Sequence, residues 1–169
     1  MALATKGFRV SRFIDIQHDE WVAAGPDVVR AHYGDLQHRL DARVHPGERL
    51  RLLAPGPGGP RFERSVRRGW RVQRDVFERH HRPDGSIVDT VVAGPNWGRS
   101  ISARFWRRNE DGRPGTLVEL TVTQPLPLIG RLVARWTRRR IGRELRQGAA
   151  EDKADVEHGY AIGRALRAA

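Results

Sequence analysis

The sequence predicts a single α+β domain: about seven antiparallel strands, two short helices after the first strand, and a long helix at the C-terminus. Three observations predict it. Strand-like segments follow one another through residues 43–123 with only short turns between them, which favours an antiparallel meander over parallel βαβ units. Helical periodicity replaces them from residue 125 onward. The 169 residues contain no internal repeat and suit one domain.

The first strand and the two short helices are predicted in the first 40 residues. Residues 13–24 alternate weakly between polar and apolar positions, as a strand does. Gly25-Pro26-Asp27 ends this strand, because proline suits the first turn of a helix and Asp27 complements the helix dipole. Gly34 is the expected C-cap of that helix, and residues 35–40 predict the second.

The meander is predicted from alternation and turn residues. Asn, Asp, Gly and Pro cluster between the strand candidates, as in tight turns. Residues 55–60, Pro-Gly-Pro-Gly-Gly-Pro, are expected to form a loop with neither helix nor strand. The expected strands are residues 42–45, 48–54, 62–67, 70–80, 86–93, 99–107 and 116–123.

The closing helix carries two apolar stripes that point in different directions. The first comprises Ile129, Leu132, Val133, Trp136 and Arg140, and the second comprises Ile141, Leu145, Gly148, Asp152, Gly159 and Gly163. Because one straight helix would struggle to bury both, we predict a bend or break within residues 135–140. The domain then divides into a tail (1–11), a sheet with two helices (12–124) and a bent helix (125–169).

Composition excludes several classes of function. Cysteine is absent, so disulfides, thiolate metal sites and a cysteine nucleophile are excluded. No stretch approaches the ~20 apolar residues of a membrane span, and no apolar leader opens the chain. We therefore expect a cytoplasmic protein. No phosphate loop, dinucleotide fingerprint or His-x-x-x-His pair is present, so we expect no cofactor and no metal.

The formal net charge of +11 favours anionic partners. All but two of the 31 basic residues, Lys6 and Lys153, are arginines, and such a bias also occurs without function. The run Arg138-Arg139-Arg140 has two readings: an anion-binding surface peripheral to a membrane, or a solvated helix face partly neutralised by nearby glutamates.

The order of elements, with several local motifs, resembles the helix-grip arrangement of the START-like or Bet v 1-like (SRPBCC) superfamily, which includes polyketide cyclase/dehydrase and lipid-transport proteins. Residues 18–29, His-Asp-Glu-Trp-Val-Ala-Ala-Gly-Pro-Asp-Val-Val, resemble the family's first strand entering its first helix. Tyr33-Gly34-Asp35-Leu36 resembles the start of its second helix, and residues 115–120 resemble its last strand. Pro125-Leu126-Pro127 then leads into the final helix. The resemblance spans residues 12 to 165.

This resemblance implies a curved sheet wrapped around the long helix, with a cavity between them. Such cavities hold hydrophobic or aromatic molecules: polyketides, lipids, isoprenoids or quinones. The implied function is carriage of such a ligand, or its cyclisation or dehydration; the sequence leaves open whether the protein is an enzyme. The alternative is a basic interaction protein that docks on an anionic membrane, an acidic partner protein or, less favoured, nucleic acid. The oligomeric state is not predicted.

Candidate site residues are few. A cavity acid or base would be Asp152, Glu119 or His18. Each has a structural alternative; for Asp152 this is a buried ion pair with a strand arginine such as Arg74 or Arg104. The expected ligand-binding residues are Trp70, Trp97, Trp106, Trp136, Asp89, Leu145 and Val156, and the tryptophans have core packing as their alternative.

Overall fold

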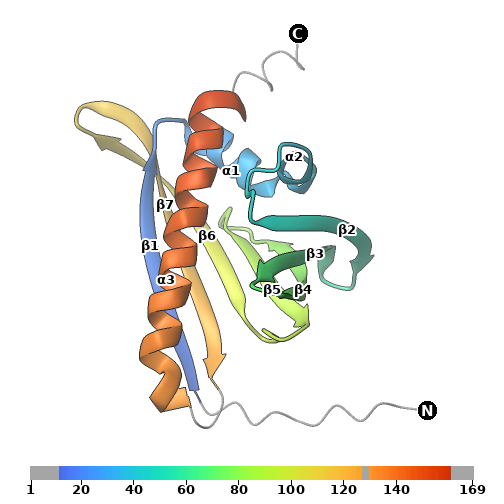
Figure 1. Ribbon diagram of the computed structural model, residues 1–169. Helices are drawn as coiled ribbons and strands as arrows, with labels where there is room; N and C mark the ends of the chain where they lie inside the picture. The colour runs from blue at the N-terminus through green and yellow to red at the C-terminus, as the bar shows by residue number, and fades with distance from the viewer. Residues whose placement is uncertain (1–11, 127–129, 161–169) are drawn as a thin grey trace.

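The computed structural model describes residues 12–126 and 130–160, and its elements follow the predicted order (Figure 1). They are β1 (Arg12–Val22), α1 (Pro26–Gly34), α2 (Leu36–Asp41), β2 (Glu48–Gly56), β3 (Gly59–Arg68), β4 (Arg71–His81), β5 (Ile87–Ala93), β6 (Ser100–Glu110), β7 (Arg113–Leu126), α3 (Gly130–Asp155) and a π-helical turn, η1 (Val156–Tyr160). The predicted α+β helix-grip fold is confirmed.

The seven strands form one antiparallel sheet in the order β1-β7-β6-β5-β4-β3-β2. The first two strands of the chain therefore occupy opposite edges, and α1 and α2 connect them. β1 pairs with β7 in continuous register, from Arg12 opposite Leu126 to Val22 opposite Thr116. Figure 1 shows the sheet curving from β1, which lies beside α3, round to β2 on the opposite side.

The core forms three clusters along the concave face of this sheet. Midway along α3, Ile141 packs on Ile14 and Val122. Farther along, Ala149 of α3 and Val156 of η1 pack on strands and on α1. A third cluster lies away from the helix, where the rings of Phe62 and Phe77 stack with centroids 5.1 Å apart. Space remains between the third cluster and the helix.

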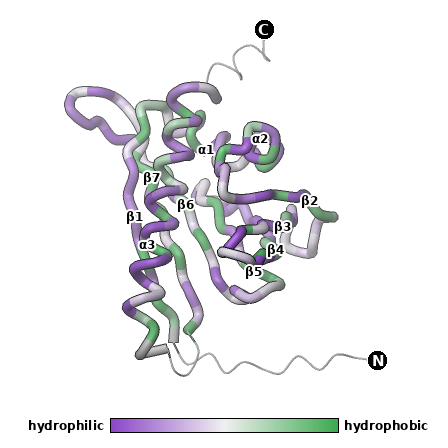
Figure 2. Tube along the Cα trace, in the orientation of Figure 1, coloured by the Kyte–Doolittle hydropathy of each residue, from purple (hydrophilic) through white to green (hydrophobic). Residues whose placement is uncertain are grey.

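The helix α3 runs without a break through residues 135–140, so the predicted break there is wrong. The reason is that, among the side chains that the structure describes, only the second stripe is buried: Ile141 and Asp152 face the core, whereas Val133 and Trp136 of the first stripe are exposed. Residues 127–129 and 161–169 lie outside the described part of the chain. Figure 2 shows the same feature of α3: the helix is largely hydrophilic, and its hydrophobic positions recur at intervals.

Three boundaries also differ from the prediction. Residues 42–45 form turns and bends instead of a strand, and the expected loop at 55–60 is a tight hairpin in which Gly56 pairs with Gly59. Gly59 permits this with φ +142°. Pro125 and Leu126 end β7 instead of opening the helix. None of the described helices has the length and apolarity to cross a membrane.

Candidate ligand cavity

A cavity of about 370 Å³ lies between the sheet and α3. Its size falls within the range of small-molecule sites. The concave faces of β2 to β7 form one wall, α3 forms the other, and α1, α2 and residues 45–47 border it. The apolar part of the lining includes Leu50, Phe62, Phe77, Ile101, Leu120, Val122, Ile141 and Leu145.

Much of the remaining lining is charged. Six arginines reach the cavity, together with five acidic residues and one histidine: Arg39, Arg64, Arg67, Arg68, Arg79, Arg99, Glu48, Asp89, Glu144, Glu151, Asp152 and His45. A cavity that served only to bind hydrocarbon would not carry so many ionised groups, because each costs desolvation unless it is paired. The pairing of these groups therefore indicates which of them are structural.

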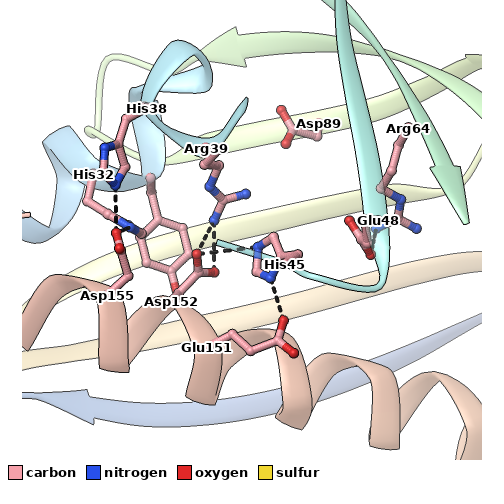
Figure 3. A network of polar contacts seen from close by, with 12 residues as sticks. His32, His38, Arg39, His45, Glu48, Arg64, Asp89, Glu151, Asp152 and Asp155 are labelled. Carbon is pink, nitrogen blue, oxygen red and sulfur yellow. Dashed lines mark hydrogen bonds and ion pairs between the residues drawn. The ribbon is translucent and has the colours of Figure 1, made fainter. Parts of the chain in front are cut away.

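Asp152 is held by Arg39 and His45. The Arg39 guanidinium places Nη2 at 2.7 Å and 2.8 Å from the two carboxylate oxygens of Asp152. His45 Nδ1 donates to Glu151 Oε2, 2.7 Å away, and its Nε2 is 3.5 Å from Asp152 Oδ1. In Figure 3 the side chains of Arg39 and His45 point at Asp152 from above the helix.

These contacts fix the charge state of the cluster. Burial alone would raise the pKa of the Asp152 carboxyl, but the charge of Arg39 and then the hydrogen bond with His45 lower its pKa to about 2. Burial would likewise lower the pKa of His45, yet its hydrogen bond and charge interaction with Asp152 raise it above 6.5. Asp152 is therefore an ionised carboxylate at neutral pH.

Arg79 and Asp89 form a second buried pair across β4 and β5. Arg79 Nε and Nη2 donate to the two oxygens of Asp89 at 2.7 Å and 2.6 Å. The remaining nitrogen, Nη1, donates to the backbone oxygen of Tyr33 at 2.7 Å. This bidentate pair thus ties the end of α1 to the sheet.

Arg99 differs from these two arginines because none of its described contacts is with a carboxylate. Its side chain donates to the amide oxygens of Gln124 and Asn96, and only 4% of the residue is exposed. Burial, followed by the charge of Arg64, lowers the pKa of Arg99 to about 10. Arg64 is 3.4 Å from Glu48 and lies over the ring of Phe77. The Arg64 and Arg99 end of the cavity is therefore suited to an incoming anion or carbonyl oxygen.

Three predicted site residues line this cavity: Asp152, Asp89 and Leu145. Val156 is buried in the core beside α1 and does not line it. The alternative expected for Asp152, an ion pair, is what the structure shows, although the partner is Arg39 of α2 and not Arg74 or Arg104.

The four tryptophans do not line the cavity, so that placement is wrong. Trp70, Trp97, Trp106 and Trp136 are 82%, 59%, 54% and 60% exposed. Trp70 and Trp97 occupy the turns after β3 and β5, while Trp106 and Trp136 lie on the outward faces of β6 and α3. A strand or helix has two faces, and residue size alone does not say which one is inside.

Glu119 and His18 also lie outside the described cavity lining. Glu119 pairs with Arg104 of the neighbouring strand, with 3.2 Å between Oε1 and Nη1, on a partly exposed face. His18 is 3.3 Å from Glu20 on β1. Neither position supports the predicted role of a cavity acid or base.

The arginine run divides into two environments. Arg138 and Arg139 are exposed, whereas Arg140 contacts Glu144 at 3.1 Å and lies over the ring of Trp136. The cavity residues that the sequence did not reveal are Arg39, His45, Arg64 and Arg99. No periodicity distinguishes them from the other arginines and histidines, because their roles depend on elements distant in sequence.

A second polar cluster lies beside this cavity, outside its lining. His32 of α1 and His38 of α2 both place Nε2 against Asp155 Oδ2 at the end of α3. These residue types are able to hold a metal ion.

No protein-family model matches the chain, and no curated protein matches it in sequence. Solved structures do. TTHA0849 from Thermus thermophilus is 17% identical with a TM-score of 0.69, covering 85% of this chain and 97% of its own. A START superfamily protein from Mycobacterium smegmatis is 16% identical with a TM-score of 0.66, covering 85% and 97%. The Zhui aromatase/cyclase from Streptomyces sp. R1128 is 17% identical with a TM-score of 0.61, covering 87% and 98%.

These similarities extend over nearly the full length of both chains in each comparison, at identities that show the fold alone. The strand order, the two short helices after β1 and the long closing helix agree with the predicted resemblance. The chain therefore has the same helix-grip fold as these START superfamily and aromatase/cyclase structures.

Proposed function

We propose that the protein binds a small hydrophobic or aromatic molecule that also carries oxygen groups, in the cavity between the sheet and α3. A polyketide or an oxygenated isoprenoid, quinone or lipid has this character. The function is carriage of that molecule, or its cyclisation or dehydration. The similarity to an aromatase/cyclase and to a START superfamily protein supports this class of ligand.

The observation that carries the proposal is Arg99. A buried guanidinium without a hydrogen-bonded carboxylate partner is costly, and Arg99 is such a group at the wall of the cavity. A ligand oxygen placed between Arg99 and Arg64 would accept charge-assisted hydrogen bonds there. The rings of Phe62 and Phe77 and the side chain of Ile101 offer the apolar contact on the same side.

The guanidinium groups of Arg99 and Arg64 also suit cyclisation chemistry. A carbonyl oxygen gains negative charge when its neighbouring carbon loses a proton, and a fixed cation nearby stabilises that enolate. Asp152 is ionised and hydrogen-bonded, so we propose that it orients Arg39 and His45 instead of donating a proton. His45 is then the cavity group whose charge changes nearest to neutral pH.

Two fluorescent probes test the cavity: N-phenyl-1-naphthylamine, which is neutral, and 1-anilinonaphthalene-8-sulfonate, which is anionic. The substitution Ala103→Leu fills the cavity wall and should abolish binding of both. Ser102→Leu, at the next position of β6 and outside the lining, is the matched control and should retain both. Equal binding by all three proteins would refute a ligand site here.

Arg99→Gln tests the role of the buried cation. We expect binding of the sulfonate probe to weaken about tenfold or more, in line with the ~1.5–3 kcal/mol of a hydrogen bond to a charged group. The neutral probe should bind within about twofold of the unchanged protein. Native mass spectrometry of protein purified from its own host would then identify the natural ligand.

A second function is favoured by one observation, the exposed basic and aromatic surface of α3. We propose that Arg135 and Arg139, with the exposed side chains of Val133 and Trp136, contact an anionic membrane surface. Exposed tryptophan beside arginine suits the headgroup region of a bilayer.

Vesicle sedimentation tests this second function. Binding to phosphatidylserine-containing vesicles should fall with added salt and with Arg135→Glu/Arg139→Glu. Arg107→Glu/Arg108→Glu, on an exposed part of β6, makes the same charge change elsewhere. Equal losses from both pairs would show a response to net charge alone, and equal binding to neutral vesicles would contradict the proposal.

A further inference from the structure

Two imidazoles and one carboxylate converge beside the cavity. His32 Nε2 is 2.8 Å from Asp155 Oδ2, and His38 Nε2 is 2.7 Å from the same oxygen. One ligand atom from each of the three residues lies within 4.8 Å of the other two. Figure 3 shows both histidine rings meeting Asp155 from the side of α1 and α2. The three donors come from three different elements.

The local structure holds each donor in place. His32 is fully buried near the end of α1. Between the two histidines, Asp35 caps α2 by accepting the backbone N–H of His38 at 2.8 Å, which fixes the position of His38 in the first turn of that helix. Asp155 is the last residue of α3 before the π-helical turn η1. The site is thus built on helix ends and not on a free loop.

The π-helical turn completes this arrangement. It packs the ring of Tyr160 edge-on against both histidines, with centroids 4.9 Å from His32 and 4.7 Å from His38. Such turns are rare and occur frequently at functional sites. Tyr160 therefore restricts rotation of the two rings that face Asp155.

The donor set selects a class of ion. Two neutral imidazoles and one carboxylate suit divalent first-row metals such as zinc or iron, and leave coordination positions open. Donors at ~2.1 Å from such an ion in tetrahedral geometry lie about 3.4 Å apart. The separations of 2.7 Å and 2.8 Å need to open only slightly.

We propose that His32, His38 and Asp155 form a binding site for one divalent first-row transition-metal ion. Such an ion would join α1 and α2 to the end of α3. It would thereby fix the position of Arg39, which follows His38 in α2 and reaches Asp152 at the cavity wall. The site is separate from the proposed ligand function, since neither histidine lines the cavity.

Titration of the chelator-treated protein with Zn²⁺ or Co²⁺ alone tests the site. Calorimetry should give one equivalent, and Co²⁺ should develop visible absorption bands. Asp155→Asn, which keeps a hydrogen-bond acceptor, and His38→Gln should each weaken binding more than tenfold. The exposed His81→Gln is the matched control and should bind as the unchanged protein does.

A variant that gains a spectroscopic signal separates a direct change at the metal site from misfolding, which can only lose signal. His38→Cys replaces one donor by a thiolate, so bound Co²⁺ should show an additional sulfur-to-metal charge-transfer band in the near ultraviolet. The proposal is overturned if the unchanged protein binds no metal, or if Asp155→Asn and His38→Gln bind it as tightly as His81→Gln does. Absence of the charge-transfer band in a Co²⁺-loaded His38→Cys protein would also overturn it.

Discussion

Asp152 and Glu119 each form an ion pair with an arginine, and the two pairs differ in how deeply they are buried. The Asp152 side chain is 6% exposed and Arg39 14%, whereas Glu119 and Arg104 are 30% and 48% exposed. Removing one member of a buried pair leaves the other charge without compensation, while a surface pair is screened by water.

Asp152→Asn should therefore lower the free energy of unfolding by about 3 kcal/mol. Glu119→Gln removes the same charge from the exposed pair and should cost less than about 1 kcal/mol. Urea denaturation followed by tryptophan fluorescence measures both. Similar losses for the two variants would contradict the assignment of Asp152 and Arg39 as a structural pair.

The depressed pKa of Asp152 also predicts how stability depends on pH. The pKa of this carboxyl is about 2 in the folded protein and 3.8 ordinarily. Its contribution is therefore complete above pH ~4 and lost as the pH falls towards 2, amounting to roughly 2 kcal/mol. Asp152→Asn should flatten this part of the stability curve, measured by urea midpoints between pH 2 and 5. An unchanged slope would show that other carboxyls dominate.

At this scale the sequence predicted part of the site. Asp152 and Leu145 were found because helical periodicity places them on the inner stripe of α3, and Asp89 because it is a carboxylate in an otherwise apolar strand. The partner of Asp152 was not found, because pairing between α2 and α3 depends on how two remote helices meet. Nothing in the sequence distinguishes Arg99, whose properties arise from burial among Gln124, Asn96 and Arg64.

Turns between strands are the elements with the strictest local requirements. Gly94, after β5, has φ +116°, and a Cβ there would lie 2.6 Å from the backbone oxygen of Arg74. Gly69, in the turn between β3 and β4, also has positive φ, +59°, but open space around it. The first position combines backbone strain with a clash, and the second has strain alone.

Gly94→Ala should therefore destabilise the protein by about 2–3 kcal/mol, and Gly69→Ala by about 1 kcal/mol. Thermal unfolding monitored by circular dichroism gives both values. If Gly69→Ala proved the more damaging, steric contact at Gly94 would not be the cause.

Element order was predictable because alternation, prolines and glycines act locally. Pro26 started α1, and residues such as Gly85 and Gly112 marked turns. The errors came from non-local effects. The glycines and prolines of residues 55–60 form the turn through which β2 pairs with β3, and α3 stays continuous while Val133 and Trp136 of its first stripe are exposed.

The excess of positive charge belongs to the whole molecule. Net charge of +11 on 169 residues produces self-repulsion that salt screens. Raising NaCl from 10 to 150 mM shortens the Debye length from about 30 Å to about 8 Å. Because this weakens the repulsion, it should raise the melting temperature. Arg138→Glu/Arg139→Glu reduces the net charge and should reduce this increase. A melting temperature that falls with salt would show that attractive ion pairs outweigh the repulsion.

The pairing of β1 with β7 has a consequence for synthesis of the chain. Arg12 lies opposite Leu126, so a ribosome releases the first strand long before its partner exists. During that interval Ile14 and Ile16, which α3 later covers, have no native neighbours to pack on. Closing so long a loop is slow compared with forming the hairpins of β2 to β6. The nascent chain therefore carries an exposed apolar strand until its last third emerges, and this strand is where a chaperone would bind.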